Sequence, residues 1–287
     1  MAVTVPVVLT IAGFDPSSGA GITADIKTIA AHECYGVACI TALTVQSTQG
    51  VRQVETVDPK IIVATLEELV SDITVEAVHV GMLGNEQTVR VVADFLAQAR
   101  LPHVVVDPIL KSSSGADLLD AAGIRLLIER LIPLAEVVTP NLDEAGILAE
   151  MGSVSNLEQM REAAARLHSV GAANVVVTGG HLEKAIDLLS FTTARGTETE
   201  VFKADRLRSN STHGTGCAFS TALACHLALG RGLPEAVLLS KVYVSAAIAN
   251  AHPLGHGNGP LHHLYRMSQQ RRASTVVSDQ EPAHSRN

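Results

Sequence analysis

Short, fully apolar runs alternate with longer helix-like segments along most of this chain, and this alternation limits its possible folds more than any other feature. The runs include Val104-Val105-Val106 and Val175-Val176-Val177, which contain no polar position. Strands of this kind suit a parallel sheet covered on both faces, because a half-exposed sheet alternates apolar and polar residues. The pattern therefore predicts a doubly wound α/β fold, with ligands outside the carboxyl ends of the strands.

The same pattern gives the expected elements and their limits. We predict strands at Val5–Ile11, Val75–Val80, His103–Asp107, Glu136–Thr139 and Asn174–Thr178. We predict helices near Ala20–His32, Pro59–Ser71, Gln87–Gln98, Ala116–Leu131, Asn156–Ser169, Gly216–Leu229 and Pro234–Ala251. Leu188–Thr193 and Thr197–Lys203 flank a short turn and are typical of a β-hairpin. No Pro/Gly/Ser linker divides the chain, so we expect one domain over residues 1–266, followed by a disordered tail over residues 267–287.

The composition narrows the classes of function. The 287 residues carry 21 Lys plus Arg against 29 Asp plus Glu, a net charge of −8. A general nucleic-acid binder needs a basic stripe to displace counterions, so we expect no nucleic-acid partner. The four cysteines form no Cys-x-x-Cys pair, which favours a reducing compartment. The apolar run Val3–Ala12 is too short to span a bilayer, so we expect a cytoplasmic protein without a membrane partner.

A glycine-rich segment, His213-Gly214-Thr215-Gly216-Cys217, leads directly into a helical pattern. Such a turn leaves several backbone N–H groups aimed at one point, where the helix dipole adds positive charge. This arrangement predicts a site for an anion, most commonly phosphate. We expect Cys217 to have a lowered thiol pKa, because it lies at a helix N-terminus. The motif therefore indicates phosphoryl transfer.

Other candidate ligand groups follow the predicted strands. The amide of Gln46 can pair with the edge of an aminopyrimidine, although a solvated turn is the better explanation of this segment taken alone. Met82 can cover a flat ring or simply fill the core. Gly19-x-Gly21-x-x-Ala24 matches the dinucleotide fingerprint, but the loop before it is long and no ribose-binding acid follows the next strand.

Carboxylates also follow two strands. Asp107 and Glu144 could share an Mg²⁺ ion through water while the ion bridges nucleotide phosphates. Asn141 and Glu144 also have the spacing of a helix capping box, and both functions can coexist. Thr178 and Gly179 end a further strand, where backbone N–H groups could approach a phosphate.

Together these pieces resemble the hydroxymethylpyrimidine/phosphomethylpyrimidine kinase family of thiamine biosynthesis, within the ribokinase-like superfamily. The matching segments, in order over residues 5 to 255, are Ile11-Ala12-Gly13, Gly19-Ala20-Gly21-Ile22-x-Ala24-Asp25-x-Lys27-Thr28, Ile40-Thr41-Ala42-Leu43-Thr44-x-Gln46, Gly81-Met82-Leu83, Asp107-Pro108, Thr139-Pro140-Asn141-Leu142-x-Glu144-Ala145, Thr178-Gly179-Gly180 and His213–Cys217. One segment departs from the family pattern, since the lysine that often lies six residues after the aspartate is here Lys111, two positions earlier.

The resemblance implies a ribokinase-like fold, with a mostly parallel central sheet, helices on both faces and a small β flap. It implies transfer of the ATP γ-phosphate to the 5-hydroxymethyl group of 4-amino-5-hydroxymethyl-2-methylpyrimidine, followed by phosphorylation of the monophosphate. ATP and Mg²⁺ are the expected cofactors, and we expect a homodimer.

The resemblance also assigns roles to individual residues. Gln46 would bind the aminopyrimidine edge, in a pocket lined by Gly13, Asp25 and Met82. The amides of Gly214, Thr215, Gly216 and Cys217 would form the anion hole, where Cys217 takes the place of the aspartate base of many relatives. The nucleotide would meet Asn141, Thr178, Gly179 and His213, and the metal would meet Asp107 and Glu144.

Four other functions stay open at this point. A pyridoxal or pyridoxine kinase would act on a similar ring alcohol. An NAD-dependent oxidoreductase would use the Gly19-x-Gly21 turn, and a non-catalytic pyrimidine-binding protein would bind the ring without releasing ADP. A cysteine acyl-transfer enzyme is weaker, because no histidine partner can be placed from the sequence.

Overall fold

The computed structural model describes residues 5–112, 115–180, 185–205, 207 and 209–267. In chain order its elements are β1 (Val7–Phe14), α1 (Gly21–Ala31), β2 (Tyr35–Ser47), β3 (Gly50–Thr56), α2 (Pro59–Asp72), β4 (Ala77–Val80), α3 (Glu86–Ala99), β5 (Val104–Val106), α4 (Ala121–Leu126), a π-helix (Leu127–Leu131), a 3₁₀-helix (Ile132–Leu134), β6 (Val137–Val138), α5 (Leu142–Leu148), α6 (Leu157–Ser169), β7 (Asn174–Gly179), β8 (Ala185–Thr193), β9 (Gly196–Ala204), α7 (Thr215–Ala228) and α8 (Leu233–Ala249).

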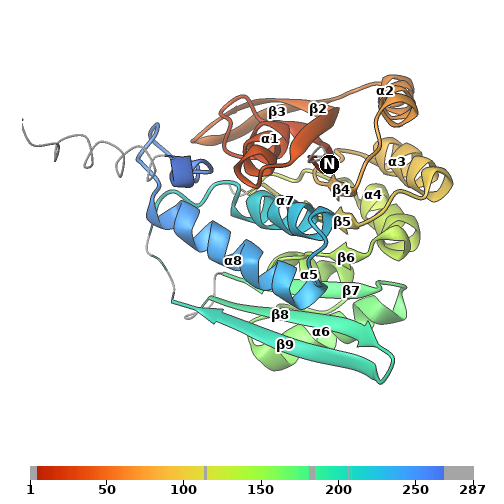
Figure 1. Ribbon diagram of the computed structural model, residues 1–287, viewed down its shortest axis with the longest axis vertical. Helices are drawn as coiled ribbons and strands as arrows, with labels where there is room; N and C mark the ends of the chain where they lie inside the picture. Colours follow the sequence, from red (N-terminus) through yellow and green to blue (C-terminus); the bar gives the residue numbers. More distant parts are fainter. Residues whose placement is uncertain (1–4, 113–114, 181–184, 206, 208, 268–287) are drawn as a thin grey trace, which may run out of the picture.

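The strands form one mixed sheet in the order β3-β2-β1-β4-β5-β6-β7-β8-β9 (Figure 1). The six strands from β2 to β7 are parallel, whereas β3 runs antiparallel at one edge and β7–β9 form an antiparallel flap at the other. The expected mostly parallel, ribokinase-like architecture is thus confirmed. Since β1 lies between β2 and β4, the chain order reverses there, which is where open α/β sheets usually bind their ligands.

Helices cover both faces of the sheet, and the apolar strands supply residues to both. Val105 and Val176 pack with the residues of α7 and α8, whereas their neighbours Val104, Val106 and Val177 pack with α2, α3 and α6 on the opposite face. Figure 1 shows α7 and α8 crossing the near face. Helix α7 is buried on nearly all sides, because it lies between the sheet and α8.

Several expected limits differ from the observed ones. The predicted helix Ala116–Leu131 begins only at Ala121, because the Asp120 side chain accepts a hydrogen bond from the Gly123 N–H and caps it there, and it becomes a π-helix after Leu126. The predicted first strand extends to Phe14. Strand β3 was not predicted, and of helix α5 only the capping box at its start was anticipated.

Within the described residues, no helix is both long and apolar enough to cross a bilayer. The expected tail lies outside the described residues from position 268 onward.

Candidate active site

The glycine-rich turn forms the N-terminus of α7. Gly214 is the N-cap residue at φ +79°, and a Cβ atom there would lie 1.9 Å from the carbonyl oxygen of Gly19. Only glycine fits such a left-handed backbone conformation against another main chain. Within the described part of the chain, the N–H groups of Gly216 and Cys217 have no hydrogen-bond acceptor. The turn therefore presents donors and a helix dipole to an anion.

A second loop, residues 15–20, packs against this turn. The Asp15 carboxylate accepts hydrogen bonds from the N–H and hydroxyl of Ser17 and from the N–H groups of Gly19 and Ala20. The Nε2 atom of His213 donates to the same carboxylate at 2.8 Å. Burial raises the pKa of Asp15, but the bonds from His213 and Ser17 outweigh it and lower the pKa overall. An ionised Asp15 thus ties the loop after β1 to the turn before α7.

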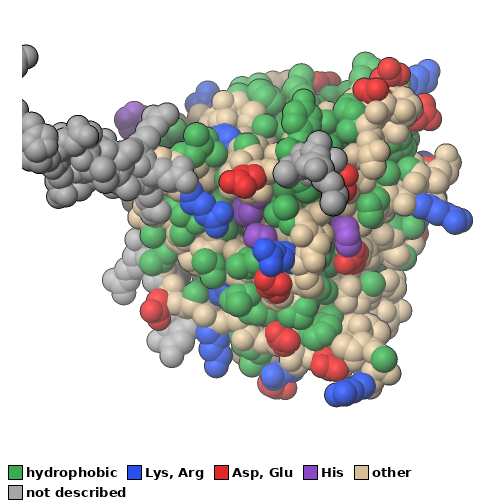
Figure 2. Space-filling model, viewed as in Figure 1, with side chains coloured by type: hydrophobic (Ala, Val, Ile, Leu, Met, Phe, Trp, Pro, Cys, Tyr) green, Lys and Arg blue, Asp and Glu red, His purple; other side chains and the backbone are tan. Residues whose placement is uncertain are grey.

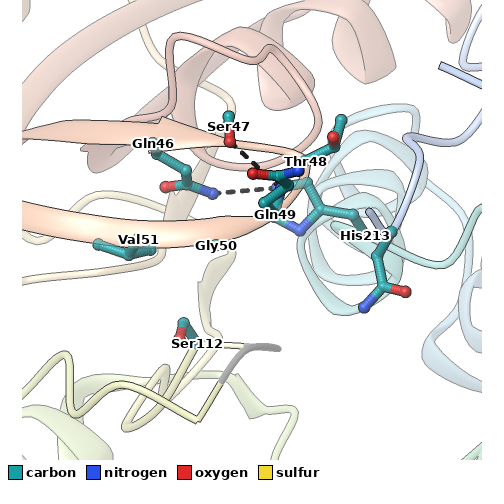
Figure 3. Close-up of a pocket in the computed structure, with 9 residues that line it drawn as sticks. Gln46, Ser47, Thr48, Gln49, Gly50, Val51, Ser112 and His213 are labelled. Atoms are coloured by element: carbon teal, nitrogen blue, oxygen red, sulfur yellow. Dashed lines mark hydrogen bonds between the residues drawn. The ribbon is translucent and has the colours of Figure 1, made fainter. Parts of the chain in front are cut away.

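Gln46 lies at the end of β2, next to these loops (Figure 3). Its Oε1 atom accepts a hydrogen bond from the Thr44 hydroxyl at 3.1 Å. Its Nε2 atom is 3.1 Å from His213 Nε2, which donates to Asp15 and therefore cannot accept from the amide at the same time. Gln46, Ser112 and His213 are among the residues lining a cavity of about 30 Å³ here. A cavity of this size has room for only a few water molecules. The Thr44 hydroxyl holds the Gln46 amide, and a heterocycle would have to widen this region.

His213 was expected on the nucleotide side, but the structure places its ring at the Gln46 end. The reason is its pairing with Asp15, described above. Gly13 and Met82 do lie together, because a Cβ atom on Gly13 would be 2.9 Å from Met82 Sδ. Asp25 lies deeper than expected: its side chain is 0% exposed and accepts hydrogen bonds from Thr10 and Thr221.

Two buried carboxylates lie beside the anion-binding turn. Asp107 follows β5, and its Oδ2 atom would be 3.7 Å from a Cβ on Gly216. Glu144 and Asn141 form the predicted capping box of α5, with bonds of 2.9 and 3.0 Å. Burial raises the pKa of Asp107 to about 6. Burial and the nearby charge of Asp107 raise the pKa of Glu144 to about 8.

The predicted thiolate character of Cys217 is wrong. Burial, followed by the charges of Asp107 and Asp25, raises the pKa of this thiol well above its ordinary value. The side chain is 7% exposed, and the N–H of Gly21 bonds to its sulfur. Desolvation and carboxylates therefore outweigh the helix dipole, and the resting side chain is a neutral thiol.

The strand end at Thr178 and Gly179 also differs from expectation. The Thr178 N–H donates to the Pro140 carbonyl at 2.9 Å, and the Gly179 N–H donates to Asp187 Oδ1 at 3.0 Å. Asp187 in turn pairs with the buried Lys241, at 2.6 Å. These two N–H groups are therefore occupied, and this strand end offers a phosphate no free amide at either position.

The residues present fit the expected cofactors. Two close carboxylates supply the oxygen ligands that Mg²⁺ prefers, and their mutual repulsion, seen in the pKa of Glu144, would be relieved by a cation. The free amides at Gly216 and Cys217 suit a phosphate group.

Sequence reasoning missed three residues that organise this region: Asp15, His79 and Ser220. Asp15 occurs in a loop whose glycines drew attention first. His79 interrupts the apolar strand Ala77–Val80, and a polar residue in a strand buried on both faces is a signal that could have identified it. Ser220 lies in a mostly apolar helical segment, where nothing in the local sequence indicates a role.

Comparison with known proteins finds a matching family and several similar proteins. A profile of the family described as phosphomethylpyrimidine kinase matches residues 15–262. The chain is 44% identical over 259 residues to the thiamine biosynthesis bifunctional protein ThiED of Geobacter sulfurreducens, covering 90% of this chain but 52% of that protein. It thus spans about half the length of that relative.

Two further relatives match along nearly their whole length. The hydroxymethylpyrimidine/phosphomethylpyrimidine kinase of Rhizobium meliloti is 41% identical over 264 residues, covering 91% of this chain and 97% of that one. The structure of an ADP complex of Bacillus subtilis pyridoxal kinase has a TM-score of 0.83 at 35% identity, covering 92% of this chain and 100% of that one.

Proposed function

The chain belongs to the phosphomethylpyrimidine kinase family, and we propose that it transfers the γ-phosphate of ATP to the 5-hydroxymethyl group of 4-amino-5-hydroxymethyl-2-methylpyrimidine and then to the monophosphate. The observation that carries this proposal is the turn before α7, whose free amides at Gly216 and Cys217 lie beside Asp107. An anion site next to buried carboxylates suits a metal-bound phosphate.

In the proposed reaction, the protein contributes position and charge. Phosphoryl transfer spreads negative charge over three equatorial oxygens, so aimed donors lower its barrier. The amides of Gly216 and Cys217 would bind these oxygens. Asp107 and Glu144 would hold Mg²⁺, which supplies charge neutralisation when bound.

Cys217 orients the substrate hydroxyl in this proposal. A neutral thiol cannot accept a proton without losing its own, and its raised pKa makes it a poor base in the resting state. Gln46 would recognise the aminopyrimidine edge after its amide exchanges the Thr44 hydroxyl for the ring. Asp25, which is fully buried, would support the pocket without contacting the ring.

A pyridoxal kinase is the second candidate, favoured by the structural similarity to the Bacillus subtilis enzyme. Both substrates are six-membered aromatic rings with a hydroxymethyl group, so the transfer chemistry is the same.

ADP release tests the proposal directly. The pyrimidine alcohol, its monophosphate, pyridoxine and ribose are assayed side by side at equal concentrations. We expect the highest kcat/KM with the pyrimidine alcohol and measurable release with the monophosphate. A higher kcat/KM with pyridoxine would establish the second candidate instead, and release only with ribose would contradict both.

We also propose a homodimer. Helix α8 carries two exposed apolar residues, Leu238 and Val242. Figure 2, viewed as Figure 1, shows hydrophobic side chains among scattered charges on the face that α8 crosses. A surface helix normally faces water with polar residues. Light scattering should give twice the monomer mass, and Leu238→Glu should give the monomer mass.

A further inference from the structure

A histidine lies inside the central sheet with no exposed surface. His79 is the third residue of β4, and its side chain is 0% exposed. A buried titratable side chain is costly unless its polar atoms have partners. The partners of His79 connect the sheet to the helix that carries the anion-binding turn.

One ring nitrogen of His79 faces β1 and α1. Its Nδ1 atom is 3.2 Å from the Thr10 hydroxyl oxygen and 3.4 Å from Asp25 Oδ2. Thr10 donates its single hydroxyl proton to Asp25 Oδ2, at 2.7 Å. Both atoms near Nδ1 are therefore acceptors, so Nδ1 carries a proton.

The other ring nitrogen faces α7. Its Nε2 atom is 3.0 Å from Ser220 Oγ, and that hydroxyl is 3.1 Å from Asp107 Oδ2. The same hydroxyl is 3.0 Å from the Gly216 carbonyl and 3.1 Å from the Cys217 carbonyl. When Ser220 gives its single proton to Asp107 Oδ2, its oxygen is left to accept from Nε2. His79 is thus a donor on both sides, between two carboxylates.

The electrostatics agree with these hydrogen-bond directions. Burial alone would lower the pKa of His79, but the charge and hydrogen bond of Asp25 and the charge of Asp107 outweigh it and raise the pKa. Thr221, next to Ser220, donates to Asp25 Oδ1 at 2.9 Å. Helix α7 is therefore anchored to Asp25 twice, once directly and once through the histidine.

We propose that His79 is a positioning residue: by bridging Asp25 to Ser220, it holds the first turn of α7 in a fixed relation to Asp107. The carbonyls that Ser220 contacts belong to Gly216 and Cys217, whose amides form the anion site. The effect on catalysis rests on the proposed kinase function, whereas the bridge itself needs no substrate.

Loss of the bridge should slow the chemical step more than it weakens binding. Displacing an aimed group by about 1 Å can cost about 10²-fold in rate. The pyrimidine end, at Gln46, does not contact His79. The expected signature is a change in kcat with little change in KM for the pyrimidine alcohol.

Steady-state kinetics of His79→Leu, Ser220→Ala and the double variant test this. We expect kcat to fall about 10- to 100-fold in each. KM for the alcohol should stay within about twofold. The double variant should be no slower than the slower single variant, because both break one bridge. Val78→Ala is the matched control, since Val78 is also buried in β4 but packs on the opposite face.

The control variant and the results that would overturn the proposal are as follows. Val78→Ala should lower the thermal midpoint yet keep the kcat of the folded enzyme. The proposal is overturned if the losses from His79→Leu and Ser220→Ala multiply, or if kcat per folded molecule of His79→Leu equals that of Val78→Ala.

A readout without turnover separates this proposal from the proposed function. In ¹⁵N-labelled full-length protein at pH 7, long-range ¹H–¹⁵N spectra report the protonation of each ring nitrogen. We expect both nitrogens of His79 to be protonated, and Ser220→Ala to change the Nε2 signal more than the Nδ1 signal. A wild-type protein without ADP release would contradict the kinase function alone. An Nε2 signal that Ser220→Ala leaves unchanged would contradict the bridge even in an active enzyme.

Discussion

The two ends of the site differ in how completely they are formed without a ligand. At the transfer end, the turn before α7 is fixed by contacts among Gly19, Gly214 and the buried network under α7, and its amides at Gly216 and Cys217 already face outward. At the proposed recognition end, the Gln46 amide accepts a hydrogen bond from the Thr44 hydroxyl beside a cavity of about 30 Å³. The transfer end is preorganised, whereas the recognition end must rearrange.

This difference has a physical reason. Donors that stabilise a transition state work best when they need no reorganisation at the moment of reaction. A recognition group can exchange one set of hydrogen bonds for another at small net cost, because each neutral hydrogen bond contributes only about 1 kcal/mol. Substitutions at the transfer end should therefore change kcat, and substitutions at the recognition end should change KM.

The largest fall in kcat is expected from Gly214→Ala. The new Cβ would lie 1.9 Å from the Gly19 carbonyl oxygen at φ +79°, so the turn must move. We expect kcat to fall about 10²- to 10³-fold, as for loss of an aimed donor. ADP release and the thermal midpoint are measured together.

Gly230→Ala is the control for this change, since φ is +76° but no atom lies within 4 Å of the new Cβ. It should bring similar backbone strain and leave kcat unchanged. A Gly214→Ala variant within tenfold of wild type would show that the transfer end is not rigid.

A smaller effect, confined to KM, is expected from Gln46→Ala. Removing the amide should raise KM for the pyrimidine alcohol about tenfold, because one or two neutral hydrogen bonds are lost. KM for ATP should change by less than about twofold. Gln53→Ala, an exposed position on β3 outside the cavity, should change neither constant. A fall in kcat without a rise in KM would place Gln46 at the transfer end.

Cys217→Ser and Cys217→Ala should lower kcat far less than Gly214→Ala. A general base contributes about 10²- to 10⁴-fold, but the raised pKa of this thiol argues for an orienting role. We expect kcat to stay within about tenfold of wild type in both. Cys225→Ala, in the same buried helix, controls for packing. A loss of 10²-fold or more with unchanged folding would identify Cys217 as the base.

The last prediction concerns stability and its dependence on pH, at Glu144. Because its pKa is raised from 4.5 to about 8, the folded protein keeps a proton that the unfolded chain releases. This contribution to the free energy of unfolding is complete below about pH 4.5 and is lost as pH rises to about 8. Glu144→Gln mimics the protonated form, so its stability relative to wild type should increase over that range.

Urea denaturation at pH 5 and pH 8 measures this difference. The exposed Glu67→Gln variant should show no such trend. A constant difference between Glu144→Gln and wild type would mean that Glu144 is already ionised in the folded protein.

The parallel sheet and the glycine turn that begins α7 could be predicted because their signals are local. Val104–Val106 can only be a buried strand, and Gly214 to Cys217 leads directly into a helix. The capping box of Asn141 and Glu144 is equally local, and the structure confirms it.

The remaining errors concern interactions between distant parts of the chain. The hydrogen bond between His213 and Asp15 joins residues far apart in the sequence, and so does the contact between His79 and Ser220. No short motif indicates such contacts. The pKa of Cys217 was misjudged for the same reason. The helix dipole is visible in the sequence, whereas Asp107 and Asp25 reach the thiol only after folding.

The contact between Asp15 and His213 has a consequence for synthesis of the chain. These residues are 198 positions apart, so the loop after β1 leaves the ribosome long before its partner exists. At about 5–20 residues per second, the delay is roughly 10 to 40 seconds. During that interval the nascent chain has its first strand but no phosphate-binding turn. We therefore expect a partly synthesised chain to lack the proposed phosphate site, which can form only after α7 has left the ribosome.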